Sequence, residues 1–118
     1  MKRLMMVFLL IAATSIPQLA QATLVQSSGI LTLVRVHDLG TKYGPSTDSI
    51  DVEVVITLDT KPGYAFGFQL RNDTYLPARQ GMLDLLRDAF RNGWKVGINY
   101  NIDSGKKNGV INRVWVTK

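Results

Sequence analysis

The chain has 118 residues, with 14 lysines and arginines against 9 aspartates and glutamates, for a formal net charge of +5. It contains no cysteine, which excludes disulfides, thiolate metal sites and cysteine nucleophiles. This length predicts one small domain, and the modest, scattered positive charge disfavours nucleic acid as the partner.

Residues 1–22 have the pattern of an export signal. Two basic residues precede an apolar run over residues 4–13, and the small residues Ala-Gln-Ala at 20–22 offer a cleavage site. The apolar run is too short to span a bilayer, which takes about 20 helical residues. We therefore expect a signal peptide, then a single domain over residues 23–118, in a protein that is periplasmic or secreted. Without the two basic residues of the signal, 12 basic and 9 acidic residues remain, a net charge of +3.

Alternating apolar and polar residues predict five strands. They cover residues 29–37, 49–59, 64–70, 94–102 and 110–117. Residues 23–28 are mostly polar and are interpreted as a lead-in to the first strand. In the second strand one face is apolar and expected in the core, whereas the other carries Asp51 and Glu53 and is expected in solvent. Ala65 and Gly67 form a small face of the third strand, which favours close approach of another strand or subunit.

One helix is expected, over residues 76–93. Pro77 suits its first turn, where a missing N–H costs nothing, and Gly93 suits its end. The apolar positions form one broad stripe: Met82, Leu83, Leu85, Leu86, Ala89 and Phe90. The polar positions are Asp84, Arg87, Asp88 and Arg91. We expect these charges to form ion pairs along a solvent face, or across the interface between neighbouring subunits of a ring.

Three strands, a helix and two more strands are the element order of the OB-fold. This fold is a five-stranded Greek-key barrel, and here the helix falls between strands three and four. The class is mainly β, and α+β by content. Closure would cover the strand edges, and the apolar stripe of the helix would fill one open end. The alternative is an open antiparallel sheet with the helix packed on one face.

The stretches GMLDLLRDAFRNGWKVGINYN and NGVINRVWV resemble a known family. They look like the helix, glycine-containing corner, strand, turn and closing strand of the B subunits of pentameric bacterial toxins, Shiga-like ones in particular. The place of the helix is also similar to that in small exported bacterial OB-fold proteins. The toxin resemblance implies a pentameric subunit that recognises glycan receptors and carries a catalytic partner. Such subunits typically contain a disulfide, which this chain cannot form.

Few residues are candidates for catalysis or metal binding. His37 is the only histidine, and Asp38 beside it would point to the opposite face of a strand. A metal site from His37 with Asp38, Asp48 and Asp51 is conceivable, but a surface histidine is the favoured interpretation. Asp51 and Glu53 share a strand face and are interpreted as a charged exterior rather than an acid and base pair. No catalytic or dinucleotide motif is present, which favours a protein that is not an enzyme and uses no cofactor or metal.

Two loops favour binding. OB-folds bind ligands on the face of strands two and three, flanked by the first-to-second and fourth-to-fifth loops. Here those loops are residues 38–48 and 103–109. Their candidate ligand-binding residues are Lys42, Tyr43, Lys106, Lys107 and Asn108. A tyrosine plane with lysine charges suits a sugar or an anionic polymer. We expect the partner to be a glycan, a small ligand or a protein. Trp94 and Trp115 are expected to pack in the core or an interface.

Overall fold

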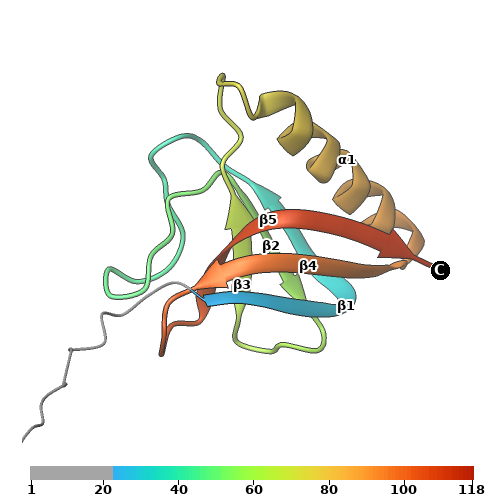
Figure 1. Cartoon of the computed structure of the whole chain (residues 1–118), viewed down its shortest axis with the longest axis horizontal. Coiled ribbons are helices and arrows are strands. Elements are labelled where there is room, and N and C mark those ends of the chain that lie inside the picture. Colours follow the sequence, from blue (N-terminus) through green and yellow to red (C-terminus); the bar gives the residue numbers. More distant parts are fainter. Residues whose placement is uncertain (1–22) are drawn as a thin grey trace, which may run out of the picture.

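Five strands and one helix follow one another in a computed structural model that describes residues 23–118. The expected signal peptide, residues 1–22, lies outside the described residues. The elements are β1 (Thr23–Val36), β2 (Val54–Leu58), β3 (Ala65–Phe68), α1 (Leu76–Asn92), β4 (Lys95–Ile102) and β5 (Asn108–Thr117) (Figure 1). The expected order of elements is therefore confirmed. Within the part of the chain described, no helix is long and apolar enough to cross a membrane.

The five strands form one sheet in the order β1-β2-β3-β5-β4, and β4 pairs back to β1. The long β1 makes this possible because its first half pairs with β4 and its second half with β2, both antiparallel. Strands β3 and β5 run parallel over three residue pairs. The sheet is therefore mixed, which the sequence-based alternative of an open antiparallel sheet did not anticipate.

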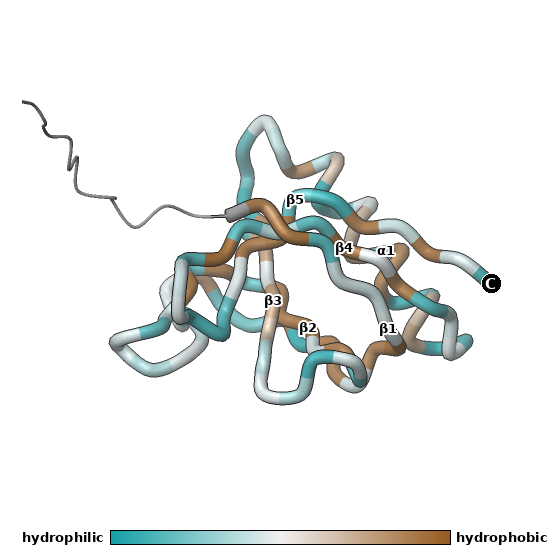
Figure 2. Tube along the Cα trace, turned by 60° about the horizontal axis from the view of Figure 1, so that its bottom comes forward, coloured by the Kyte–Doolittle hydropathy of each residue, from teal (hydrophilic) through white to brown (hydrophobic). Residues whose placement is uncertain are grey.

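The main core lies between the inward faces of the strands and the helix. Its largest fully buried side chains include Phe66, Phe68 and Tyr100, and the rings of Phe66 and Tyr100 lie 4.4 Å apart. Apolar residues concentrate along the strands, whereas the connections at their ends are mostly hydrophilic (Figure 2). The helix packs against β1, β4 and β5.

The helix begins and ends where the sequence predicts. Pro77 lies in its first turn, and Gly93 takes a left-handed conformation (φ 66°) while its N–H donates to the Ala89 carbonyl oxygen. The apolar stripe is broader than the contact that it makes. Leu86 and Ala89 are buried, but Leu85 and Phe90 are exposed at 37% and 49%. The edges of the stripe therefore face solvent because only its centre reaches the sheet.

The first strand begins earlier than its pattern predicts. Residues 23–28 are not a lead-in but belong to β1, where they pair with β4 from Ile102 to Gly97. Among these residues, Ser27 is accommodated by a hydrogen bond of 2.8 Å between its hydroxyl and the Tyr100 hydroxyl. The interpretation as a lead-in failed because the pairing partner lies about 70 residues away.

The second strand is shorter than predicted, and the apolar residues of its predicted range do not all lie on one face. Regular pairing begins only at Val54. Val54, Ile56 and Leu58 point into the main core, as expected, but Ile50 and Val52 form a second cluster on the opposite face. They cover Val55 and Ala65 there, together with Tyr43. Val55 and Glu53, expected in solvent, are consequently buried.

The close approach expected at Gly67 comes from the chain itself. A Cβ added at Gly67 would lie 2.5 Å from the Val54 carbonyl oxygen and 2.6 Å from a methyl group of Val52. Backbone and a β-branched side chain cannot move aside cheaply. Segment 50–53 therefore crosses β3 at a point where only glycine fits.

Substituting Gly67 tests this crossing. We expect Gly67→Ala to lower the free energy of unfolding by about 1–3 kcal/mol through overpacking. The matched control is Gly81→Ala, since nothing lies within 4 Å of a Cβ added at this helical position. It should raise stability by about 0.5–1 kcal/mol, because alanine favours the helix. Urea denaturation followed by circular dichroism measures both; a neutral Gly67→Ala would contradict the crossing.

Candidate functional site

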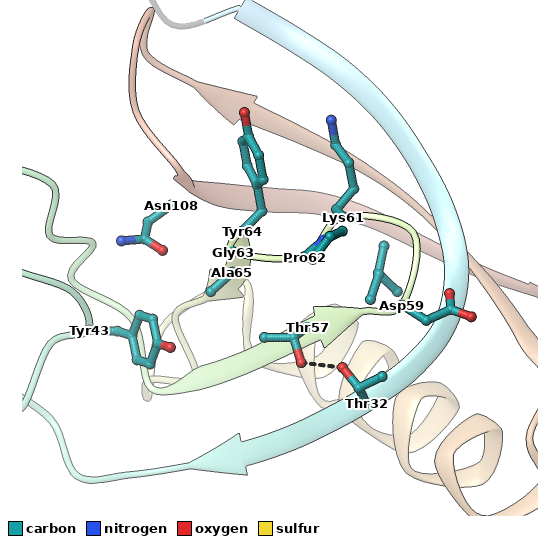
Figure 3. Close-up of a pocket in the computed structure, with 11 residues that line it drawn as sticks. Thr32, Tyr43, Thr57, Asp59, Lys61, Pro62, Gly63, Tyr64, Ala65 and Asn108 are labelled. Carbon is teal, nitrogen blue, oxygen red and sulfur yellow. Dashed lines mark hydrogen bonds between the residues drawn. The ribbon is translucent and has the colours of Figure 1, made fainter.

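A pocket of about 550 Å³ opens on the outer face of β1, β2 and β3 (Figure 3). This volume lies within the range of about 300–1,000 Å³ typical of small-molecule sites. The pocket is lined by Thr32, Tyr43, Thr57, Leu58, Asp59, Lys61, Pro62, Gly63, Tyr64, Ala65 and Asn108. It lies on the part of the outer face that the Ile50 and Val52 cluster leaves uncovered.

The floor of the pocket carries two threonines from neighbouring strands. Thr57 faces outward from β2, as Val55 does, and Thr32 lies at an irregularity of the β1–β2 register between Leu31 and Leu33. Their hydroxyl oxygens are 2.6 Å apart and hydrogen-bonded (Figure 3). Each hydroxyl keeps capacity for a further bond, so the floor offers both donors and acceptors.

The turn between β2 and β3 forms one wall. The Asp59 carboxylate accepts the Ile30 N–H at 2.8 Å, and the Asp59 N–H donates to the Ile30 carbonyl at 3.0 Å. These reciprocal bonds fix the turn against β1. Beyond them, the ammonium of Lys61 lies 4.7 Å from the centre of the Tyr64 ring, and that of Lys107 lies 5.0 Å from it.

Tyr43 and Asn108 form the opposite wall. Tyr43 and Ile50 exchange two backbone hydrogen bonds of 3.0 and 2.9 Å, and the Arg35 guanidinium lies 5.6 Å from the tyrosine ring. The Asn108 amide nitrogen donates to the Asp48 carbonyl at 2.7 Å. Its side-chain carbonyl oxygen is thereby left facing the pocket (Figure 3).

The two loops that flank the pocket are joined by a latch centred on Asp48. The Asp48 carboxylate accepts the Lys107 N–H at 2.7 Å, and the Lys106 ammonium donates to the Thr47 carbonyl. Gly44 permits the close packing, since its φ is 100° and a Cβ there would lie against the Asp48 carbonyl oxygen and the Asn108 amide. Residues 38–48 and 103–109 therefore act as one structural unit.

The structure brings together part of the predicted set of ligand-binding residues. Tyr43 and Asn108 line the pocket, and Lys107 lies beside it against Tyr64. Lys106 supports the latch and lines neighbouring hollows instead. Lys42 is exposed at a positive φ of 62° and does not line the pocket.

Sequence reasoning missed the residues of the floor and of the β2–β3 turn. Thr57 and Asp59 were placed on the outward face by alternation, and OB-folds bind on that face, so the signal was present. Lys61 and Tyr64 could have been added as the residues that bracket the turn next to it. Thr32 carries no such signal, because its place beside Thr57 depends on the β1–β2 register.

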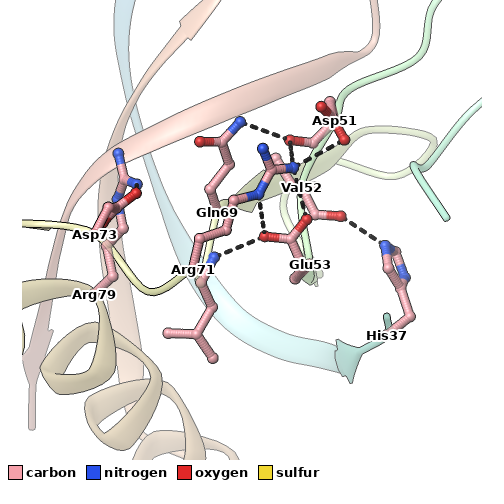
Figure 4. A network of polar contacts seen from close by, with 9 residues as sticks. His37, Asp51, Val52, Glu53, Gln69, Arg71, Asp73 and Arg79 are labelled. Carbon is pink, nitrogen blue, oxygen red and sulfur yellow. Dashed lines mark hydrogen bonds and ion pairs between the residues drawn. The ribbon is translucent and has the colours of Figure 1, made fainter. Parts of the chain in front are cut away.

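His37, Asp51 and Glu53 belong to a structural network on another part of the surface (Figure 4). Glu53 is 4% exposed and receives two hydrogen bonds from Arg71, at 2.9 and 2.8 Å, and one from the Leu70 N–H at 2.9 Å. Arg71 also pairs with Asp51 at 3.0 Å. The expectation that Glu53 belongs to a solvated exterior is therefore wrong, because Arg71 compensates its charge on burial.

The histidine is held by the backbone. Its Nε2 lies 2.6 Å from the Val52 carbonyl oxygen, which can only accept, so this nitrogen carries the proton. Among residues 23–118 there is no group of three or more histidine, aspartate or glutamate side chains that would hold a metal ion. His37 thus supports the segment that precedes β2.

The Arg71 hydrogen bond is the main influence on the acidity of Glu53. It lowers the pKa of Glu53 below its ordinary value, burial acts in the opposite direction, and the Leu70 N–H and the nearby positive charges lower it further. The same pairing raises the pKa of Arg71. Both groups are therefore kept charged, which suits a structural ion pair.

The candidate interface residues on the helix make contacts within one chain. Arg87 pairs with Asp84 at 3.2 Å, one turn apart, and Gln80 donates to the same carboxylate. Asp88 and Arg91 are exposed. A role for these four residues between subunits stays a prediction.

Comparisons with protein-family models, curated proteins and solved structures gave no match for this chain. The interpretation of the site therefore depends on its geometry.

The buried ion pair predicts a pH-dependent stability. A carboxyl with a lowered folded-state pKa stabilises the fold above its unfolded value of about 4.3, and this contribution is lost as the pH falls through the folded value. Glu53→Gln should cost about 1–3 kcal/mol near neutral pH, and the difference from the wild type should shrink with acidification. Urea unfolding across a pH series measures this. Asp84→Asn, in an exposed pair, is the control, and a pH-independent difference would contradict the assignment.

The hydrogen bonds of Asp48 predict a local effect on the opening of loop 38–48. Asp48→Ala removes the carboxylate that accepts the Lys107 N–H, at an expected cost of about 1 kcal/mol. Hydrogen exchange should accelerate at the amides of Tyr43 and Ile50, because loop 38–48 loses an anchor. Asp38→Ala, at an exposed position of the same segment, should leave exchange unchanged. Equal acceleration in both variants would show that Asp48 is not the anchor.

Proposed function

We propose that this protein is a non-enzymatic OB-fold module that binds glycans in the pocket between Tyr43 and Tyr64. The observation that carries the proposal is the position of this pocket. It lies on the outer face of β2 and β3 and is flanked by both loops that the sequence singled out. This is the face on which OB-folds bind oligosaccharides and oligonucleotides.

The strand pairings support the OB-fold. A bent first strand that pairs with both β2 and β4, a parallel β3–β5 contact, and a helix between β3 and β4 are features of that barrel. The helix contributes Leu86 and Ala89 to the core, as expected of an element that fills an open end.

The chemistry of the lining favours a sugar. The lining combines threonine and tyrosine hydroxyls, an amide and a lysine with the apolar residues Leu58, Pro62 and Ala65. Such mixed donors and acceptors match the hydroxyl groups of a sugar, and a tyrosine ring offers an apolar plane to its C–H face. Base stacking on single strands relies on successive aromatic platforms, which favours a glycan over nucleic acid.

The contacts of the acidic side chains are more consistent with binding than with catalysis. The Asp59 carboxylate is engaged by a backbone N–H, and Glu53 by Arg71. Glu53, which Arg71 keeps charged, is not poised to exchange a proton with a ligand. The export pattern of residues 1–22 supports a module that acts in the periplasm or outside the cell.

Blocking the pocket tests the function. We expect the wild-type protein to bind members of an immobilised glycan library. Thr57→Tyr should weaken that binding at least about tenfold, since a larger side chain on the floor occupies the ligand's space while tyrosine suits a strand.

The matched control is Lys42→Gln, which removes a loop charge outside the pocket. It should bind like the wild type, and both variants should unfold at the wild-type urea concentration. Glycan binding that survives Thr57→Tyr, or no binding to any glycan, would refute the proposed function.

A further inference from the structure

A second hollow adjoins the pocket across Tyr64. It has a volume of about 290 Å³ and is lined by Val25, Lys61, Tyr64, Tyr100, Ile102, Asp103, Ser104, Gly105 and Lys106. Lys61 and Tyr64 line both hollows. They stand together at the edge of the first pocket, pointing away from the Thr32–Thr57 pair (Figure 3). Tyr64 is thus a ridge between two hollows rather than the end wall of one.

The ridge carries positive charge from two different turns. Lys61 comes from the β2–β3 turn and Lys107 from the β4–β5 turn, and both ammonium groups lie within about 5 Å of the Tyr64 ring. Among residues 23–118, the ion pairs are formed by Arg71, Arg79 and Arg87, and neither lysine takes part in one. Their charges are therefore available to an anion.

Three carboxylates lie near the ridge, and among residues 23–118 none of them forms an ion pair with Lys61 or Lys107. Asp48 and Asp59 each use a carboxylate oxygen to accept a backbone N–H, from Lys107 and Ile30 respectively. Asp103 lines the second hollow, in the exposed turn with Ser104. Lys61 and Lys107 on the ridge are therefore the ammonium groups offered to an anion, while Asp59 and Asp103 each line one of the two hollows.

We propose that the ligand is a linear acidic oligosaccharide that lies across Tyr64, with a sugar unit in each hollow and its anionic groups against Lys61 and Lys107. This inference rests on the proposed function and names its ligand class. A sugar ring packs its C–H face on the tyrosine, while carboxylate or sulfate groups take charge-assisted hydrogen bonds from the lysines. A ligand confined to the first pocket would leave the second hollow unused.

Probes that differ in chain length test the extended binding mode, and probes that differ in charge test the acidic ligand class. The probes are a disaccharide and a hexasaccharide of galacturonate, the methyl-esterified hexasaccharide, a heparin-derived hexasaccharide and an oligothymidylate, titrated by calorimetry. We expect the hexasaccharide to bind about tenfold or more tightly than the disaccharide, and the methyl ester to lose that gain. Tighter binding of the heparin probe, which carries sulfates in addition to carboxylates, would show that sulfate contributes to recognition, whereas tighter binding of the galacturonate probe would show that carboxylates suffice.

Two variants locate the ligand on the chain. The double variant Lys61→Ala/Lys107→Ala should weaken hexasaccharide binding about tenfold or more and reduce its dependence on salt, whereas Lys42→Gln should not. Ser104→Trp, in the exposed turn, should fill the second hollow. It should reduce hexasaccharide affinity to the disaccharide value and leave disaccharide affinity unchanged.

The outcomes distinguish the two proposals. Binding of neutral glycans that is blocked by Thr57→Tyr, with no effect of charge or of the lysine variants, keeps the function but overturns the acidic ligand. Equal affinity for disaccharide and hexasaccharide overturns the extended mode. No binding to any acidic glycan, or tighter binding of oligothymidylate, overturns the inference as a whole.

Discussion

The ion pair between Glu53 and Arg71 determines how the outer face of the sheet is covered. Glu53 directly precedes β2 and Arg71 follows β3, so the ion pair joins the two antiparallel strands at one end, next to the Val54–Phe68 register position. A buried carboxylate without its partner would be strongly unfavourable, so segment 50–53 stays where Arg71 can reach it. That position places Val52 over Gly67, and the absence of a side chain at Gly67 lets the segment lie close to β3.

This arrangement divides the outer face into a covered and an open part. Ile50, Val52 and Tyr43 cover Val55 and Ala65, whereas Thr57 and Thr32 remain accessible next to them. Tyr43 lies at the boundary and belongs to both parts. The extent of the crossing segment therefore sets the boundary of the pocket, and Tyr43 in the pocket wall packs against the Ile50–Val52 cluster. Loop 38–48 and the sheet therefore form this site together.

Local signals in the sequence predicted local structure well. Pro77 and Gly93 delimited the helix because capping depends on nearby residues, and alternation identified the inward faces of β2 and β3. Properties set by distant partners were missed. The sequence around Glu53 predicts a surface residue, because its partner Arg71 lies 18 residues further along the chain. Ile50 and Val52 lie on the unexpected face because the strand is interrupted before Val54. The pocket was half predicted for the same reason: Tyr43 and Asn108 lie in recognisable loops, while Thr32 depends on register.

The latch also affects the affinity of the pocket for a ligand. A loop of eleven residues would ordinarily lose conformational freedom when it closes on a ligand, and that loss weakens binding. Here Asp48 already joins residues 38–48 to the β4–β5 turn, and the bonds between Tyr43 and Ile50 fix the tyrosine. The entropy is lost during folding instead of binding. Gly44, with its φ of 100°, accepts the backbone conformation that this closure requires. The side chains that stay free to adjust are Lys61 and Lys107, whose long stems can follow an anionic group along the ridge without moving the wall.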